Sequence, residues 1–387
     1  MLLLRNVDLY TPTPAGRGDV LLGGGRVLHV APGLDLPPAW GETADTAGLL
    51  ALPGFIDAHV HITGGGGEGG YATRTPELLL SDAIEGGVTT VVGCLGTDGI
   101  TRSLAGVLAK ARALDEEGIT AFMWSGHYAV PVHTLTGSIE RDLLVVDKVI
   151  GVGEVAVSDH RSTQPTFDEF ARLAAEARRG GILSGKAGIV NVHVGDGPRG
   201  LDLLRRVTAA TEIPVTQFVP THINRNPALF QEGIAWAKAG GYVDFTTSTV
   251  PAFLDEGEVK CSVGLRRMLE AGVDISRITV TSDGQGSLPA FDGQGALARL
   301  DIGRVTSLFA EVRDAVRQEG LALEVAVQTI TSNPARTLKL RGKGRIAPGA
   351  DADLVLVEPD SLAIRGVIAR GRWLMRDGVP LVHGTFQ

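Results

Sequence analysis

The stretch Gly54-Phe55-Ile56-Asp57-Ala58-His59-Val60-His61-Ile62-Thr63, followed by four glycines and Glu68, decides how the chain is interpreted. Apolar residues lead into two histidines two positions apart, and side chains two apart on a strand point to one face. Two imidazoles on one face at a strand end can hold a metal ion if other segments supply further ligands. The pair alone also fits a structural role in the core. The glycines permit close backbone approach, so we expect Glu68 to turn back over the site.

Length and composition restrict the class of protein. The chain has 387 residues, 44% of them hydrophobic, which is enough for a large core and a single barrel. A formal net charge of −8 predicts no nucleic-acid partner. Cys94 and Cys261 lie far apart and suggest a reducing compartment without a disulfide framework. The apolar residues 1–4 are too few for a signal peptide or a membrane span, so we expect a cytoplasmic protein with no membrane partner.

The middle of the chain alternates between strand-like and amphipathic segments. Strands are predicted over 55–61, 88–95, 120–125, 149–158, 189–194, 215–221, 243–247 and 278–282, and helices over 76–85, 104–116, 167–178, 201–210, 227–239 and 265–271. Eight strands with intervening helices favour a (β/α)8 TIM barrel over an open doubly wound sheet. We expect this barrel to occupy residues 51–340. No glycine-rich phosphate motif follows a predicted strand, so nucleotide binding is a weak alternative.

The two ends of the chain have a different character from the middle. Residues 1–50 and 341–387 contain short strand-like runs broken by proline and glycine: 2–9, 19–22, 26–31, 352–357, 364–369 and 373–375. We expect them to form one small β-sandwich-like domain built from both termini. Two separate small domains are a weaker alternative, because each end has few strands with which to bury a core.

Partners for the two histidines lie at the ends of other predicted strands. In a parallel barrel, functional side chains project from the C-terminal ends of the strands. Those ends carry Glu154, His193, His222 and Asp283, on the fourth, fifth, sixth and eighth strands. With His59 and His61 on the first strand, four imidazoles and two carboxylates can hold two divalent cations, one carboxylate bridging them. Each residue alone also fits a structural role such as a helix cap, but six together favour a metal site, and their chemistry favours Zn²⁺.

Several motifs carry a resemblance to a known family. They lie at residues 53–61, 64–68, 73–77, 96–98, 158–162, 221–226, 282–284 and 342–355, and so are spread over nearly the whole chain. On these motifs the chain resembles the amidohydrolase superfamily and, within it, the isoaspartyl dipeptidases, also called β-aspartyl peptidases. The segment 342–355 is shared across the superfamily, whereas the Gly-rich segment ending at Glu68 and the Ser-Asp-His-Arg segment are more specific.

The sequence departs from that family at one ligand. The resemblance implies a carboxylated lysine seven residues before Arg161, but Glu154 occupies this position. A glutamate offers bridging oxygens on a shorter arm, so we expect its strand to lie closer or to bulge, aided by Gly151 and Gly153. Lys148 is a less favoured carboxylated alternative, because it lies nearer the strand start. We therefore interpret the chain as a glutamate-bridged variant.

The resemblance implies metal-dependent hydrolysis of the isoaspartyl amide bond in a small dipeptide, β-Asp-Xaa, releasing aspartate and an amino acid. It also implies assembly as a homo-oligomer. Asp283 would accept a proton from the attacking water and deliver it to the leaving amine. Tyr128 resembles the family tyrosine that donates a hydrogen bond to the oxyanion, although a tyrosine at the barrel rim is an alternative.

The charged residues of the same motifs suggest how a dipeptide would bind. Arg161 and Arg225 suit capture of carboxylates, and the alternative is a pair of solvated ion pairs at the rim. Glu68 can pair with the α-ammonium of the substrate. Three further substrate contacts are expected: the hydroxyl of Ser287 and backbone groups at Gly66 and Thr97.

Two other functions fit parts of this pattern. The first is an amidohydrolase that acts on a cyclic amide or an N-acyl amino acid, which would need no glutamate to hold an ammonium. The second is a non-catalytic scaffold on the same barrel. Loss of metal ligands would mark a scaffold, and the expected ligand set is complete in this sequence.

Overall fold

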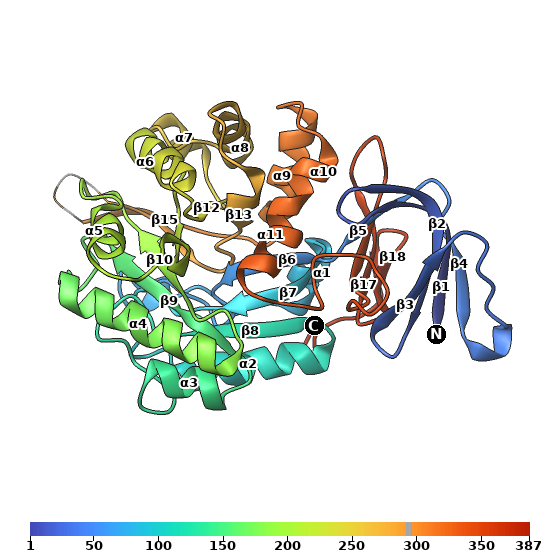
Figure 1. Cartoon of the computed structure of the whole chain (residues 1–387), viewed down its shortest axis with the longest axis horizontal. Coiled ribbons are helices and arrows are strands. Elements are labelled where there is room, and N and C mark those ends of the chain that lie inside the picture. Colours follow the sequence, from blue (N-terminus) through green and yellow to red (C-terminus); the bar gives the residue numbers. More distant parts are fainter. Residues whose placement is uncertain (292–293, 295) are drawn as a thin grey trace.

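The fold is described from a computed structural model that covers residues 1–291, 294 and 296–387. Eight parallel strands surround the centre of its larger part (Figure 1). They are β6 (Phe55–Val60), β7 (Val88–Gly93), β8 (Thr120–Ser125), β9 (Val149–Val157), β10 (Ile189–Val194), β11 (Phe218–Thr221), β12 (Val243–Thr246) and β13 (Ile278–Thr281). Strands β6 to β11 form one sheet, and β12 pairs with β13. Val60 pairs with Gly284 beyond β13, and the N–H of Ile223 beyond β11 donates to the carbonyl oxygen of Asp244 in β12. These two contacts join the sheets into a ring, so the predicted (β/α)8 barrel is confirmed.

Helices cover the outside of the barrel. They are α1 (Leu80–Glu85), α2 (Leu104–Glu117), α3 (Ile139–Val145), α4 (Phe167–Ser184), α5 (Asp202–Ala210), α6 (Pro227–Lys238), α7 (Pro251–Asp255), α8 (Cys261–Glu270), α9 (Ser307–Arg317), α10 (Leu323–Ala326) and α11 (Ser332–Thr337). Their apolar faces pack on strands that are buried along their whole length, such as β7 and β10. The predicted helix over 76–85 begins only at Leu80, and the predicted strand over 215–221 begins with a 3-10 turn, Val215–Gln217.

A second sheet combines strands from both ends of the chain. From the N-terminal end come β1 (Leu2–Tyr10), β2 (Pro14–Gly23), β3 (Arg26–Ala31), β4 (Glu42–Asp45) and β5 (Leu50–Pro53). From the C-terminal end come β16 (Leu354–Val357), β17 (Ile364–Ala369), β18 (Arg372–Arg376) and β19 (Val379–Pro380). The junction is the antiparallel pair β5 and β16, and Figure 1 shows the blue and red strands side by side next to the barrel.

One hairpin lies outside both sheets. Its strands are β14 (Ser287–Phe291) and β15 (Leu297–Ile302), which follow the last barrel strand. Residues from both strands line the cavity at the C-terminal ends of the barrel strands. The hairpin was not predicted from the sequence, although Ser287 at its start was expected to contact the substrate.

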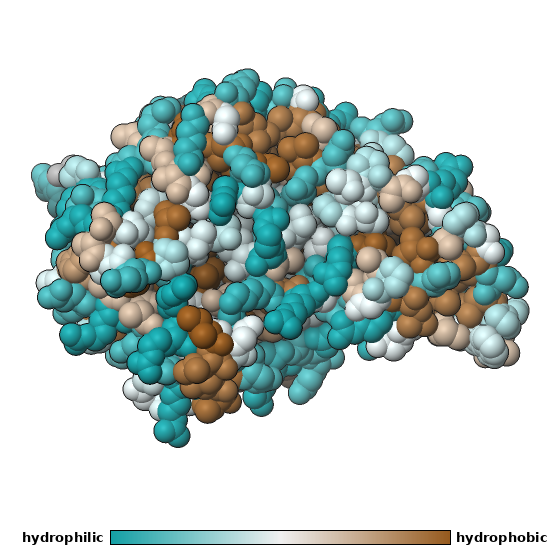
Figure 2. Space-filling model, in the orientation of Figure 1, coloured by the Kyte–Doolittle hydropathy of each residue, from teal (hydrophilic) through white to brown (hydrophobic). Residues whose placement is uncertain are grey.

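The outer surface has a mixed polar and apolar character. Exposed apolar side chains gather at the C-terminal ends of α3 and α4, namely Leu144, Val145, Ile182 and Leu183. Figure 2 shows an apolar patch in this part of the surface among largely hydrophilic residues. None of the helices within the described residues combines the length and the apolar composition that crossing a bilayer requires.

Candidate metal centre

The six predicted ligands converge at the C-terminal mouth of the barrel, and all six are buried. The carboxylate of Glu154 lies at their centre. Its Oε1 atom is 3.3 Å from Nε2 of His61, and its Oε2 atom is 3.3 Å from Nε2 of His59. The same Oε2 is 3.2 Å from Nδ1 of His193 and 3.7 Å from Nε2 of His222. Both carboxylate oxygens therefore face imidazole nitrogens, as a bridging ligand requires.

A bulge in β9 brings Glu154 into this position. Val152 lies opposite Val190, but Val155 lies opposite Val192, so β9 holds one extra residue beside β10. Gly153 has a φ of 150° there, and a Cβ atom on it would lie 2.7 Å from the carbonyl oxygen of Asn191. A glycine is therefore needed where the strand bulges. The expected bulge is present.

Lys148, the alternative bridging residue, lies outside this cluster. It directly precedes β9, and its ammonium group forms an ion pair with Asp115. The long side chain is thus held at the opposite end of the strand from Glu154, in agreement with the geometric argument against it.

Several atoms of the cluster that could ligate a metal have no hydrogen-bond partner among the described residues. These are both ring nitrogens of His59, Nδ1 of His61 and Oδ1 of Asp283. Asp283 Oδ1 lies 3.0 Å from Nε2 of His61 and 3.6 Å from Nε2 of His59. Burying a polar atom without a partner costs about 1–3 kcal/mol, so such atoms are normally paired. Nitrogen and oxygen donors that converge without partners fit divalent cations.

Neighbouring polar groups orient two of the imidazoles. Asp159 Oδ2 lies 2.9 Å from Nε2 of His193, which leaves Nδ1 of this ring facing Glu154. The hydroxyl of Thr246 lies 2.5 Å from Nδ1 of His222, which leaves Nε2 facing Glu154. Groups that hold a ligand's second ring nitrogen fix its orientation and raise its basicity. Neither residue has a role assigned from the sequence, although Asp159 lies within the motif at residues 158–162.

Glu154, Asp283 and His222 have charge states that suit cation binding. Burial lowers the pKa of His59 and His61, but neighbouring groups such as Cys94 and Glu154 raise it more, so a bound cation would replace the protons of these two rings. Burial raises the pKa of Glu154, but the nearby imidazoles lower it more, and the resulting pKa is well below the usual range. Burial likewise raises the pKa of Asp283, and His61 and His59 lower it further than burial raises it. Burial lowers the pKa of His222 to about 3, so this ring is neutral at pH 7. Anionic carboxylates and a neutral imidazole are the forms that bind metals.

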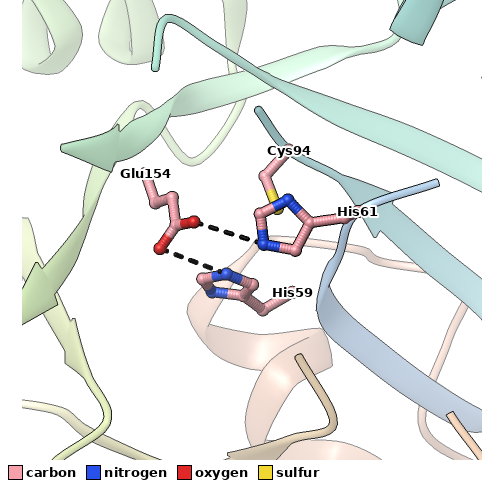
Figure 3. A group of neighbouring side chains, drawn as sticks. All are labelled: His59, His61, Cys94 and Glu154. Carbon is pink, nitrogen blue, oxygen red and sulfur yellow. Dashed lines mark ion pairs between the residues drawn. The ribbon is translucent and has the colours of Figure 1, made fainter. Parts of the chain in front are cut away.

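A third side chain without a site role assigned from the sequence, Cys94, lies beside His59 and His61. Cys94 follows β7, and its sulfur and the ligand atoms of His59, His61 and Glu154 all lie within 4.8 Å of one another. Figure 3 shows Cys94 and Glu154 approaching the two imidazoles from different strands. The expectation that functional side chains follow barrel strands would have found this residue, since it comes directly after the second strand.

A cavity of about 1100 Å³ opens above the cluster. It is lined by all the residues that the sequence analysis expected to contact a substrate: Gly66, Glu68, Thr97, Tyr128, Arg161, Arg225 and Ser287. Tyr128 lies next to the predicted metal ligands, with its hydroxyl 2.8 Å from Nδ1 of His193. Burial and the charge of Glu154 raise its pKa well above the usual value, so the hydroxyl keeps its proton.

Glu68 turns back over the cavity and has two different carboxylate oxygens. Oε1 accepts hydrogen bonds from the hydroxyls of Thr97 at 3.3 Å and Ser287 at 2.9 Å, and from Nη1 of Arg161 at 3.3 Å. Oε2 is buried without a partner among the described residues. Oε1 is therefore held in place by the protein, while Oε2 remains able to accept hydrogen bonds from a ligand.

The guanidinium groups of Arg161 and Arg225 differ in how strongly they are paired with protein groups. Arg161 donates from Nη2 to Asp159 at 2.8 Å, and its guanidinium lies 5.4 Å from the ring centre of Tyr128. Arg225 has one looser ion pair, 3.6 Å from Asp196, and its Nε has no partner among the described residues. Burial lowers the pKa of both guanidinium groups, but neighbouring acidic groups raise it more, so both stay charged.

The amidohydrolase family model matches residues 50–194 and 256–374, which is most of the chain. The chain belongs to the amidohydrolase family. A solved β-aspartyl dipeptidase from Fervidobacterium islandicum, in complex with β-Asp-Leu, is 48% identical, with a TM-score of 0.92 and coverage of 98% of each chain. This similarity confirms the resemblance to isoaspartyl dipeptidases that the motifs indicate.

More distant amidohydrolases are similar over a comparable length. The allantoinase of Deinococcus radiodurans is 25% identical, over 92% of this chain and 86% of its own. The dihydropyrimidinase of Brevibacillus agri is 19% identical, with a TM-score of 0.68 and coverage of 99% of this chain and 96% of its own. At this identity the second similarity supports the fold alone.

Proposed function

We propose that this amidohydrolase cleaves the isoaspartyl amide bond of β-Asp-Xaa dipeptides, releasing aspartate and an amino acid. The observation that carries the proposal is the relative solved with β-Asp-Leu, which is 48% identical over 98% of the chain. The cavity supports it independently, because its charged groups complement a zwitterion with two carboxylates. The enzyme is a metal-dependent hydrolase in this proposal, and the dipeptide is its substrate.

Two divalent cations would be held by His59 and His61 on one side and by His193 and His222 on the other, with Glu154 between them. Asp283 would add a ligand on the first side, since its Oδ1 faces His61 at 3.0 Å. Bound divalent cations supply Lewis acidity, which acidifies water and polarises an amide carbonyl. Zn²⁺ is the metal that we propose, because the donors are imidazoles and carboxylates arranged in sets of three or more.

Asp283 is the proton carrier in the proposed reaction. Its lowered pKa keeps it anionic at neutral pH, so it can accept the proton of the attacking water. It then delivers this proton to the nitrogen of the leaving amino acid. Tyr128 keeps its hydroxyl proton and can donate it in a hydrogen bond to the oxygen that becomes negative when the carbonyl is attacked.

The unequal environments of the cavity residues suggest where each end of the dipeptide binds. The substrate ammonium would bind Oε2 of Glu68, because Oε1 already accepts hydrogen bonds from protein groups such as Ser287. A carboxylate would bind Arg225, which has free donors, and a second would bind the part of Arg161 that faces the cavity. Backbone groups at Gly66 and Thr97 would contact the remaining polar atoms, and the Ser287 hydroxyl would support Glu68 as well as contacting the substrate.

A substrate series tests the proposal. The purified protein, loaded with Zn²⁺, is assayed with β-Asp-Leu, α-Asp-Leu, allantoin, hydantoin and N-acetyl-leucine. We expect turnover of β-Asp-Leu to exceed that of every other compound. Glu68→Gln should raise KM for β-Asp-Leu without loss of bound metal, because the ammonium loses its partner. Faster turnover of a cyclic amide or of N-acetyl-leucine would overturn the assignment.

Cyclic-amide hydrolysis is the second candidate. The observation that favours it is the similarity to the allantoinase of Deinococcus radiodurans over nearly the whole chain. The argument against it is Glu68, since a neutral cyclic amide has no ammonium to place against a buried carboxylate oxygen. The same substrate series separates the two functions.

Two further properties stay predictions. Assembly as a homo-oligomer is supported by the exposed apolar side chains at the ends of α3 and α4, because patches of this kind often mark protein interfaces. A cytoplasmic location is supported by two buried cysteines that are both free. Light scattering of the purified protein tests the first, and cell fractionation tests the second.

A further inference from the structure

Cys94 occupies a position that the proposed mechanism does not use. It follows β7 directly, and its backbone N–H donates to the carbonyl oxygen of Val60 at 3.0 Å. That hydrogen bond holds it beside the segment that carries His59 and His61. The side chain is completely buried.

The four candidate ligand atoms of this group lie close to one another. The sulfur of Cys94, one nitrogen each of His59 and His61 and one oxygen of Glu154 all lie within 4.8 Å of one another. Ligand atoms in a tetrahedral zinc site, with Zn–N and Zn–S bonds of about 2.0–2.3 Å, lie roughly 3.3–3.7 Å apart. In Figure 3 the sulfur points toward the imidazoles rather than away from them.

A second observation points to a ligand at the same place. Neither ring nitrogen of His59 has a hydrogen-bond partner among the described residues, although the residue is completely buried. A neutral thiol would satisfy these nitrogens poorly, because S–H is a weak donor and sulfur a weak acceptor. A cation between the sulfur and the rings would be a partner for the sulfur and for one nitrogen of each ring.

We propose that Cys94 binds, as a thiolate, the metal ion held by His59 and His61. The inference rests on the proposed metal-dependent function and adds a ligand to the six derived above. The S–H bond breaks, a sulfur–metal bond forms, and the proton leaves to solvent. Glu154 and Asp283 supply two negative charges against the four of two divalent cations, and the thiolate supplies a third. A soft ligand of this kind favours Zn²⁺, Co²⁺ or Cd²⁺ over Mg²⁺, Mn²⁺ or Ca²⁺.

The alternative is that Cys94 is a small apolar residue that fills the barrel interior. It also contacts the cluster of buried side chains that includes Val92 and Trp124. Free cysteines are common in such places. In that case the metal would bind through nitrogen and oxygen donors without sulfur, so spectroscopy of the ligands distinguishes the two roles.

The test uses the metal-loaded full-length protein. Zinc K-edge absorption spectroscopy of the wild type should show a Zn–S distance of about 2.3 Å, and the cobalt form should show a thiolate-to-cobalt charge-transfer band. Cys94→Ser should lose both signals and bind its first metal at least ~10-fold more weakly, a loss as large as changes around metal ligands cause. Cys261→Ser is the matched control, because Cys261 is the other buried cysteine and lies in α8.

The outcomes separate this inference from the proposed function. A wild-type protein that binds zinc and cleaves β-Asp-Leu without a sulfur signal overturns the cysteine ligand and leaves the function intact. A wild-type protein that binds no metal overturns both. If Cys94→Ser fails to fold, the wild-type zinc spectrum still decides, and Cys94→Ala provides a second variant. A charge-transfer band that disappears in Cys261→Ser instead would also contradict the assignment.

Discussion

Two buried carboxylates in the barrel have opposite surroundings. Glu154 at the mouth faces four imidazoles, and nearby nitrogens lack partners. Asp244, deeper on β12, accepts hydrogen bonds from the hydroxyls of Thr221, Thr279 and Thr281, each at 2.6 Å. Burial raises the pKa of Asp244, whereas the pKa of Glu154 is lowered. Both carboxylates are buried, so what distinguishes the proposed metal site is the set of unpaired ligand atoms that converge on Glu154.

The largest effect is expected for Glu154→Gln, which removes the charge at the centre of the unpaired cluster. The amide cannot bridge two cations, so bound metal should fall from about two ions per chain to about one or fewer. Activity on β-Asp-Leu should fall more than ~10³-fold, because the cations that acidify water and polarise the carbonyl would be lost. Metal analysis and steady-state kinetics measure both. A variant that keeps its metal, or a wild type that needs bicarbonate, would contradict the glutamate bridge.

A smaller change at the mouth is Tyr128→Phe, which removes a hydroxyl but no ligand. If this hydroxyl stabilises the oxyanion, kcat should fall by ~10²–10³ with bound metal unchanged. KM should change little, because the interaction forms mainly in the transition state. Unchanged kcat would assign Tyr128 a packing role beside His193, which its 2.8 Å contact also permits.

Residues at strand ends could be predicted from the sequence more readily than residues that act through other side chains. The positions of His59 and Glu154 at the mouth of the barrel could be predicted, because barrel strands carry functional groups at their C-terminal ends. Asp159 and Thr246 could not be assigned roles, since they act through rings that only the folded chain brings near them. Cys94 obeyed the strand-end rule and was nevertheless considered only for disulfides.

The fold shows a similar division between local and long-range information. Strands β8 and β10 were predicted with their observed bounds, and β6, β7 and β9 were predicted to within two residues at their C-terminal ends. Hairpin β14–β15 was missed, because it pairs over the cavity instead of extending a buried sheet. Helix α9 (Ser307–Arg317) was also missed, although its buried Leu308, Val312 and Ala315 recur at helical spacing and would have indicated it.

Asp244→Asn tests whether the fully hydrogen-bonded carboxylate has a structural role and no role in metal binding. Replacing the carboxylate should weaken three hydroxyl hydrogen bonds and lower the free energy of unfolding by about 1–3 kcal/mol. Metal content and kcat should stay within about twofold of wild type, because this residue is paired inside the protein. Urea unfolding, metal analysis and kinetics together measure this. Loss of metal without loss of stability would show that Asp244 and its three threonine partners also support the metal site.

Glu258 is an intermediate case and gives the smallest expected effect. Burial raises its pKa from 4.5 to about 7, although Thr249 and Arg225 lower it, while Asp196 and Glu311 raise it. Between these pH values the folded state holds a proton that the unfolded state releases, so this residue's contribution to stability falls as pH rises from about 4.5 to about 7. Glu258→Gln should remove about 1–2 kcal/mol of the difference in unfolding free energy between pH 5 and pH 8.

Urea unfolding at both pH values measures this difference for wild type, Glu258→Gln and the control Glu256→Gln. Glu256 lines the same cavity but is exposed, so its replacement should leave the pH dependence as in wild type. If Glu258→Gln also leaves the pH dependence unchanged, one hydroxyl and a nearby arginine satisfy this partly buried carboxylate as well as three hydroxyls satisfy Asp244. The number of hydrogen-bond partners of a carboxylate would then not distinguish structural carboxylates from metal ligands in this barrel.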